Sequence, residues 1–364
     1  MQLSRRLSNL GVGLVPVLLA LLFTTLILIL VGAPPGKAYW NIIQGALESP
    51  NKWASVLTAT VPLLLCSAGL LVTFAAGLWN IGVEGQIVAG ALLTTWLALN
   101  LALPPILFIP LLLVAGLVGG ALWGLLAGWL KVHGGVHEIF GGVGLNFIAT
   151  VLTNYLIFGP WKPAGRATMS GTAPFPPQAW LPRLGSLPVY PIAVLLALMT
   201  IGLAHFALRG TTWGLKLKAI GNNQRSAFLM GIPTHRYMLG AFLLCGALAG
   251  LAGSIQAIGV RQRLIPGISA GYGFLALLVV LLAGYRPLWV IPIALFFAAV
   301  GVGSPRLELS LQLDSALGGT LEGIVVLFVL LAQGVRRRSA SRRLAGTQSQ
   351  SQAQAQAQEH KEAV

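Results

Sequence analysis

Long apolar runs are the feature that most constrains this chain. Many of them approach or exceed the ~18–20 apolar residues that span the hydrocarbon core of a bilayer. Only 9% of the residues are charged, whereas soluble domains carry roughly 25%. The runs lack the weak alternating pattern of a membrane barrel. The sequence therefore predicts an all-α fold, a polytopic bundle of transmembrane helices.

The apolar runs also give a count of spans and an orientation. We expect about ten spans, within a range of eight to ten, because several runs are short or broken. With both termini in the cytoplasm, the cytoplasmic segments hold fifteen of the 23 Lys and Arg residues and the outer segments hold eight. Cytoplasmic loops are enriched in Lys and Arg, so this bias predicts cytoplasmic termini. The expected spans are residues 10–31, 53–75, 85–103, 106–130, 138–158, 189–208, 237–259, 272–284, 288–303 and 321–334.

The chain divides into an expected membrane domain, residues 1–335, and a polar tail, residues 336–364. The tail begins with a basic run and continues as a Gln- and Ala-rich stretch without apolar periodicity, so we expect it to be cytoplasmic and disordered. Its basic start is expected to contact membrane lipids. The net charge of +15 lies at span ends and in the tails, which disfavours a nucleic-acid partner.

Glycines recur at every fourth residue in the expected fourth span, and a similar spacing appears in the seventh. Small residues at this spacing form a ridge along which two helix backbones approach closely. We therefore expect helix packing to be their main role. The glycines with this expected role are Gly116, Gly120, Gly124, Gly128, Gly246 and Gly250.

The most unusual stretch is residues 77–91, GLWNIGVEGQIVAGA, which places Asn80, Glu84 and Gln86 among glycines between two spans. A carboxylate near bilayer depth costs at least ~2.5 kcal/mol, so it should face protein or water rather than lipid. One hypothesis is a broken re-entrant element that lines the substrate path. The other is an ordinary cytoplasmic turn in which Glu84 caps the next helix. The sequence alone does not distinguish between these two hypotheses.

Two asparagines of the expected fifth span, Asn146 and Asn154, are eight residues apart and so lie near one helix face. They can hydrogen-bond either another helix or a polar solute, and helix contact is favoured. Asn146 is retained as a candidate pathway residue together with the three polar residues of 77–91.

The loop 210–233 between two long apolar runs carries several basic residues and no acidic residue, which places it in the cytoplasm. Asn222 or Asn223 can cap a short helix over residues 225–230, and Gly231 followed by Pro233 can end it. Such a helix would expose three apolar side chains, a pattern that favours a protein partner. A basic turn on lipid headgroups explains the same residues equally well. The apolar residues are Phe228, Leu229 and Met230.

Other candidate chemistry is weak. His133 and His137 have a helical spacing and precede Glu138, but two glycines between them and the lack of further ligands disfavour a metal site. The cysteines, Cys66 and Cys245, lie inside apolar runs and are expected to be core residues. No G-x-S-x-G nucleophile motif and no phosphate-binding loop are present. We therefore expect no enzymatic activity, no metal and no cofactor, and ATP hydrolysis would need another subunit.

Three segments together resemble one family. Gly77-Leu78, Asn80-Ile81-Gly82 and Glu84-Gly85-Gln86 look like the GL-NIG-EGQ signature of ABC transporter permeases for nucleosides and simple sugars, relatives of the branched-chain amino acid permeases. Leu145-Asn146 resembles the "LN" of the polar-edged helix that follows. The cytoplasmic GxN…A…GI loop is matched by Gly221-Asn222, Ala227 and Gly231-Ile232, and Arg225 lies within it. The resemblance covers residues 10–335 in order.

The resemblance implies a multi-pass permease subunit in the bacterial inner membrane. In such an importer two permease chains, identical or different, form the path for the solute. A cytosolic ATP-binding subunit docks on the short helix of the loop, and an extracytoplasmic solute-binding lipoprotein delivers the solute. The residues implied in docking are Gly221, Asn222, Arg225, Ala227, Phe228, Leu229, Met230 and Gly231.

One departure from the family pattern concerns the substrate. Relatives often begin the fifth span with Asn-Glu-Val-Ile, whereas this chain has residues 137–140, HEIF, followed by two glycines. Two alternatives to a nucleoside or sugar importer therefore remain. One is an ABC permease for branched-chain amino acids. The other is an ion-coupled secondary transporter, for which few intramembrane carboxylates are available.

Overall fold

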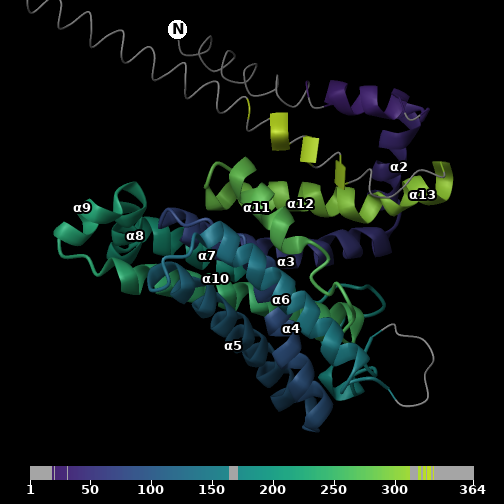
Figure 1. The fold of residues 1–364 in the computed structure, drawn as a ribbon. Helices are drawn as coiled ribbons and strands as arrows, with labels where there is room; N and C mark the ends of the chain where they lie inside the picture. The colour runs from purple at the N-terminus through teal and green to yellow at the C-terminus, as the bar shows by residue number, and fades with distance from the viewer. Residues whose placement is uncertain are drawn as a thin grey trace, which may run out of the picture. The chain divides into compact units, whose positions relative to one another are not determined.

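The computed structural model describes residues 19, 21–30, 32–163, 171–311, 319–320, 323–324, 326–328 and 331. Two compact units are present, one formed by Met1–Tyr39 with Leu307–Val364 and the other by Trp40–Arg306. Each is considered by itself. The described residues are helical apart from loops and one isolated β-bridge between Leu184 and Leu187, which confirms the predicted helical bundle (Figure 1).

The named helices follow one another along the chain, with short connections between most of them (Figure 1). They are α2 (Pro35–Leu47), α3 (Pro50–Ala75), α4 (Val83–Asn100), α5 (Pro105–Val132), α6 (Glu138–Phe158), η1 (Pro177–Ala179), α7 (Pro191–Gly210), α8 (Thr212–Asn222), α9 (Gln224–Leu229), α10 (Thr234–Ile255), the π-helix η2 (Gln256–Arg261), α11 (Tyr272–Leu282), α12 (Pro287–Gly303) and α13 (Pro305–Leu311).

Six helices of the described residues are long and apolar enough to cross a membrane, or up to seven if the bent pair Leu21–Leu30 and Pro35–Leu47 is one span. The expectation of about ten spans is therefore not supported. Helix α4 has two polar residues, Glu84 and Gln86, in its first turn, and α11 has only 11 residues. Half of span 10–31, more than half of span 321–334 and the whole tail 336–364 lie outside the described residues. The six are α3, α5, α6, α7, α10 with η2, and α12 extended to Leu307.

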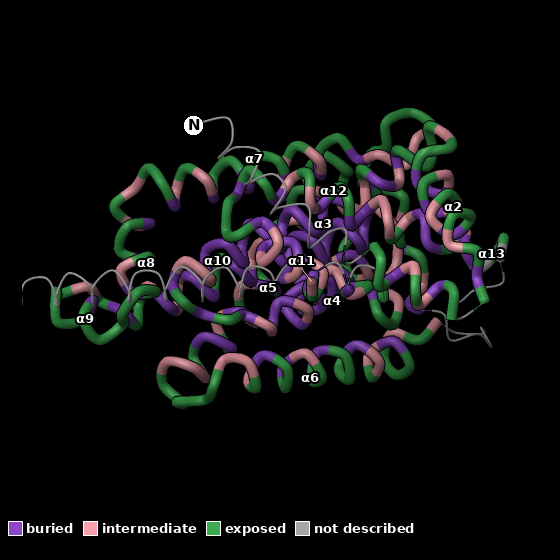
Figure 2. The backbone as a smooth tube through the Cα atoms, turned by 90° about the horizontal axis from the view of Figure 1, so that it is seen from above, coloured by how far each residue is buried: buried purple, intermediate pink, exposed green. Residues whose placement is uncertain are grey.

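Helices α3 and α10 form the centre of the second unit, and α6 and α7 lie at its margin (Figure 2). Nearly every residue of the middle of α3 is buried, although Pro62 removes one helical hydrogen bond there. By contrast, α6 exposes large apolar side chains such as Phe140 and Phe147 along much of its length. The polar residues on buried helices are therefore the ones that need partners inside the protein.

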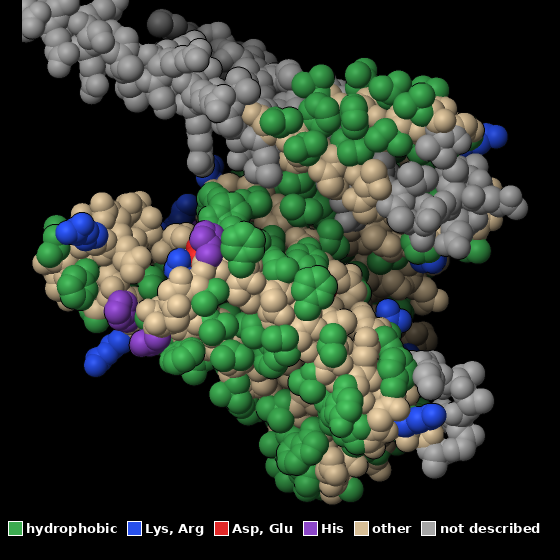
Figure 3. All heavy atoms as spheres, in the orientation of Figure 1, with side chains coloured by type: hydrophobic (Ala, Val, Ile, Leu, Met, Phe, Trp, Pro, Cys, Tyr) green, Lys and Arg blue, Asp and Glu red, His purple; other side chains and the backbone are tan. Residues whose placement is uncertain are grey.

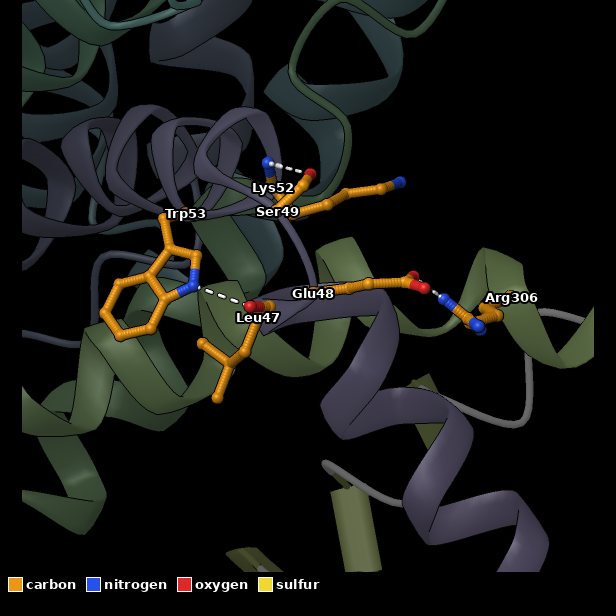
Figure 4. Close-up of polar contacts among 6 residues, drawn as sticks. All are labelled: Leu47, Glu48, Ser49, Lys52, Trp53 and Arg306. Atoms are coloured by element: carbon orange, nitrogen blue, oxygen red, sulfur yellow. Dashed lines mark hydrogen bonds and ion pairs between the residues drawn. The ribbon is translucent and has the colours of Figure 1, made fainter.

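The corner between α2 and α3 is held by side-chain contacts (Figure 4). The indole N–H of Trp53 donates to the carbonyl of Leu47 over 2.7 Å, and Ser49 caps α3 by accepting from the backbone N–H of Lys52 over 3.4 Å. Glu48 forms an ion pair with Arg306 from the start of α13. These contacts fix the direction in which the chain enters α3.

Candidate functional site

The connection between α3 and α4 carries a buried pair of amides. Gly77 has a φ of +73°, a left-handed conformation that turns the chain out of α3. Beyond this turn, the Asn80 amide donates to Gln86 Oε1 over 3.1 Å, and the Gln86 amide donates back to Asn80 Oδ1 over 3.2 Å. Both residues are at most 1% exposed. Such mutual satisfaction makes the pair a structural tie across the first turn of α4.

Glu84 ties the start of α4 to a distant helix. Its two carboxylate oxygens accept hydrogen bonds from the backbone N–H groups of Gly271, over 3.0 Å, and of Gly273, over 2.8 Å. These N–H groups belong to the first turn of α11, where they have no partner within the helix. The negative charge also complements the positive end of the α11 dipole. Glu84 is thus a cap, as one hypothesis held, but for α11 rather than for the helix that contains it.

Asn146 fixes the same connection from the side of α6. Its Oδ1 accepts from the backbone N–H of Gly85 over 2.8 Å, and its amide donates to the carbonyl of Ile81 over 3.0 Å. The backbones approach closely here, because a Cβ built on Gly82 would lie 3.2 Å from Gly142 Cα. The structure therefore brings together all four candidate pathway residues of the sequence, around the first turn of α4.

We expect the Glu84→Gln variant to be less stable than the native chain. A glutamine keeps one acceptor but places an NH₂ group opposite one of the two α11 N–H groups, so a donor loses its partner. The expected cost is ~1–3 kcal/mol. Thermal unfolding of the detergent-purified protein measures it. Glu48→Gln, which removes a half-exposed ion pair, is the control and should cost only ~0–1 kcal/mol. Equal unfolding temperatures would show that the α11 cap does not stabilise the fold.

Helices α8 and α9 project together beyond the end of the bundle (Figures 1 and 2). The side chain of Asn223 accepts from the backbone N–H of Ser226 over 3.0 Å and caps α9, and Gly231 has a φ of +81° just beyond its end. The predicted short helix is therefore present, one residue earlier than expected. Asn222 is the last residue of α8 instead.

Three consecutive apolar side chains at the end of α9 face outward. Phe228, Leu229 and Met230 are 63%, 79% and 82% exposed, whereas Ala227 beside them is buried against the rest of the protein. Arg225 is also exposed. Figure 3 shows hydrophobic and basic side chains on the surface of this end. The end of α9 is therefore a small exposed apolar surface next to a basic side chain. It is here called the α9 tip (Arg225 and residues 228–230).

The α8–α9 segment contacts the connection that carries the amide pair. A Cβ built on Gly221 would lie 2.4 Å from the carbonyl oxygen of Ala75 and 3.0 Å from the Gly77 nitrogen. Only glycine permits this approach of the end of α8 to the end of α3. A displacement of α8 would therefore act directly on the backbone that leads to Asn80.

The recurrent glycines lie between helices, mostly where α5 meets α10. A Cβ on Gly120 would lie 2.1 Å from the Gly246 carbonyl oxygen, and one on Gly250 would lie 2.1 Å from the Gly116 oxygen. A Cβ on Gly124 would lie 2.4 Å from the Phe242 carbonyl oxygen of α10, and Gly128 approaches the ring of Phe242. These distances leave no room for any side chain at the centre of the contact.

His133, His137 and Cys245 have ordinary contacts within the protein. His137 caps α6 through Nδ1, which accepts from the Ile139 backbone N–H over 3.4 Å, and His133 stacks on Trp129. Cys245 was expected to be a simple core residue, yet its sulfur accepts from the Asn80 amide over 3.1 Å. Gln256, a single amide within an apolar, glycine-rich run, was not predicted from the sequence as a candidate residue. Its isolation in such a run was the available signal.

Six long apolar helices with buried polar ties and close-packed glycines are the features of a multi-pass membrane protein. The family model described as "Branched-chain amino acid transport system / permease component" matches residues 53–331. The chain belongs to this family and is an ABC transporter permease.

Curated relatives agree with this assignment. A glucose ABC transporter permease protein of Haloferax volcanii is 31% identical, with 90% of this chain and 88% of the relative covered. A guanosine ABC transporter permease protein of Bacillus subtilis is 27% identical, with 91% and 96% covered. A nucleoside ABC transporter permease protein of Lactococcus lactis is 28% identical, with 81% and 83% covered.

Proposed function

We propose that this chain is the membrane-spanning subunit of an ATP-driven importer that carries nucleosides or simple sugars across the cell membrane. The names of three relatives that each cover more than four fifths of the chain support this cargo, because they are glucose, guanosine and nucleoside permeases. ATP hydrolysis belongs to a separate cytosolic subunit. A second permease chain and an extracytoplasmic binding lipoprotein complete the proposed assembly.

The observation that carries the proposal is the α9 tip. Its apolar side chains are exposed on a capped helix whose neighbour, α8, contacts the end of α3. Exposed apolar residues of this kind fit a protein partner better than water. In the proposed arrangement the tip faces the cytoplasm, docks on the ATP-binding subunit and passes its movement through Gly221 to Gly77. Both chain termini then lie in the cytoplasm as well.

In the proposed importer, the four polar residues around the first turn of α4 act on transport indirectly. Asn80 and Gln86 satisfy each other, and Glu84 and Asn146 bond backbone groups. They shape the solute path by holding the α3–α4 connection against α6 and α11, rather than by contacting the solute. A displacement of Gly77 would therefore move the α3–α4 connection as one unit, because hydrogen bonds hold that connection in a single conformation.

Reconstitution tests the proposal. The chain is co-expressed with the ATP-binding and permease subunits encoded beside it and placed in vesicles together with the binding protein. We expect uptake of guanosine or glucose that requires ATP and exceeds uptake of leucine. ATP-driven leucine uptake alone would assign the branched-chain amino acid alternative. Uptake by the single chain under an ion gradient would assign the secondary-transporter alternative.

A further inference from the structure

A small cavity lies at the end of the second unit away from α8 and α9. It has a volume of about 230 Å³. Thr58, in its wall, precedes Ala75 by 17 residues on α3, which corresponds to roughly 25 Å along a helix. Its walls come from α3, the segment before α7, η2, α11 and α12. The polar residues that line it are Ser55, Thr58, Arg183, Tyr190, Gln256 and Tyr272.

Gln256 is the unusual member of this lining. It is only 4% exposed, and none of the hydrogen bonds found among the described residues involves its side-chain amide. The amide is not one of the buried polar atoms that lack a partner in the described part of the chain, so its accessible surface faces the cavity that it lines. Gln256 is also the first residue of the π-helix η2, and π-helices occur frequently at functional sites. The cavity therefore offers an adjacent donor and acceptor that the protein itself does not use.

The walls around Gln256 are held rigidly. The Tyr190 hydroxyl donates to the Gly259 carbonyl of η2 over 2.6 Å and accepts from Arg183 Nε over 3.2 Å. The guanidinium lies 5.8 Å from the centre of the Tyr190 ring. From the α3 wall, the hydroxyl of Thr58 donates to the Pro188 carbonyl. The Tyr190 hydroxyl therefore already has both a donor and an acceptor partner, whereas the Thr58 hydroxyl has used its donor and can still accept from a ligand.

Glu84 has a part in the same structure. Its carboxylate caps the first turn of α11 through Gly271 and Gly273, and Tyr272 between them is the residue that α11 presents to the cavity. The conspicuous carboxylate of the sequence therefore positions an aromatic wall of the cavity without lining it. This explains physically why an acid stands at the start of α4.

The chemistry of the lining selects among solutes. Among the described residues that line the cavity none carries a carboxylate, so the ammonium group of an amino acid would find no counter-charge. A carboxamide offers one donor and one acceptor side by side, which matches the edge of a nucleobase. Arginine has donors only and matches the two neighbouring acceptors of guanine. Aromatic side chains provide a surface on which a flat ring can stack.

We propose that this cavity is a solute subsite that holds the nucleobase of a nucleoside, with the Gln256 amide hydrogen-bonded to the edge of the base. The proposal rests on the proposed function and narrows its cargo to nucleosides. Arg183, which is exposed, lines the site from the segment before α7, and Tyr272 forms the wall at the start of α11. A sugar without a base presents neither a flat edge to the Gln256 amide nor a ring face to the aromatic walls, so it is held less well.

The test compares Gln256→Leu with the native chain in the complete reconstituted importer, with guanosine and glucose as probes. Leucine keeps the volume and removes an amide that has no partner, so the unfolding temperature should stay the same or rise. Guanosine uptake at low concentration should fall about tenfold or more. Gln178→Leu, an exposed glutamine outside the cavity, is the matched control and should behave like the native chain.

A second readout does not depend on transport. In membranes holding the Ser55→Cys variant, a maleimide should label the cavity cysteine, since Cys66 and Cys245 are both buried. Guanosine should slow this labelling and glucose should not, and Gln256→Leu should abolish the protection. Absence of guanosine protection, or undiminished guanosine uptake by Gln256→Leu, overturns the subsite. If the native importer transports neither probe but guanosine still protects, the subsite stands and the proposed function fails.

Discussion

Replacing Phe228 and Leu229 together by Asp should abolish ATP hydrolysis coupled to transport while the chain still inserts into the membrane. Both side chains are largely exposed, so charges there do not disturb the fold. In an interface, however, each carboxylate would have to be desolvated without a partner, and apolar side chains that fill partner pockets contribute most of the binding energy. We expect co-purification of the ATP-binding subunit to be lost as well.

The measurement is ATP hydrolysis by the reconstituted importer, with and without solute, together with a pull-down of the ATP-binding subunit. Leu184→Asp, an exposed leucine in the segment before α7, is the matched control and should keep both. Normal coupling in the double variant would leave the α9 tip with a role on lipid headgroups only. In that case the variant should instead show weaker association with anionic vesicles.

The sequence predicted some elements residue by residue. The expected span 138–158 coincides with α6, because an apolar run preceded by a capping residue marks both the start and the length of a helix. The short helix before Gly231 was found for the same reason: the asparagine cap and the glycine stop are local signals. Helix ends, which depend on residues within about one helical turn, could therefore be predicted.

The partners of the polar residues could not be predicted in this way. The carboxylate of Glu84 bonds Gly271 and Gly273, which are 187 and 189 residues away, and no periodicity connects such positions. Hydropathy predicted a span over residues 272–284, but the helix there has only 11 residues. An apolar run indicates burial and does not distinguish burial in lipid from burial in protein. Gln256 could not be predicted for the same reason, since only the three-dimensional structure shows that its amide lines a cavity.

The Gly250→Ala variant should lose the close contact between α5 and α10 and with it most of the folded protein. An added Cβ would lie 2.1 Å from the Gly116 carbonyl oxygen and 2.7 Å from Gly120 Cα, so two backbones must separate rather than one side chain turn. Overpacking costs ~1–3 kcal/mol where side chains can yield, and more is expected here because only backbone can. Transport should disappear with the folded population.

Gly240→Ala supplies the matched control within the same helix, since a Cβ at Gly240 would have nothing within 4 Å. Alanine favours a helix over glycine by ~0.8–1.0 kcal/mol, so this variant should be neutral or slightly stabilised. Thermal unfolding of the two purified variants, and their yields in the membrane, make the comparison. Because both changes add one methyl group to α10, helix propensity cancels and the difference measures the α5–α10 contact alone. Matching unfolding temperatures would mean that the two helices do not touch along the glycine ridge.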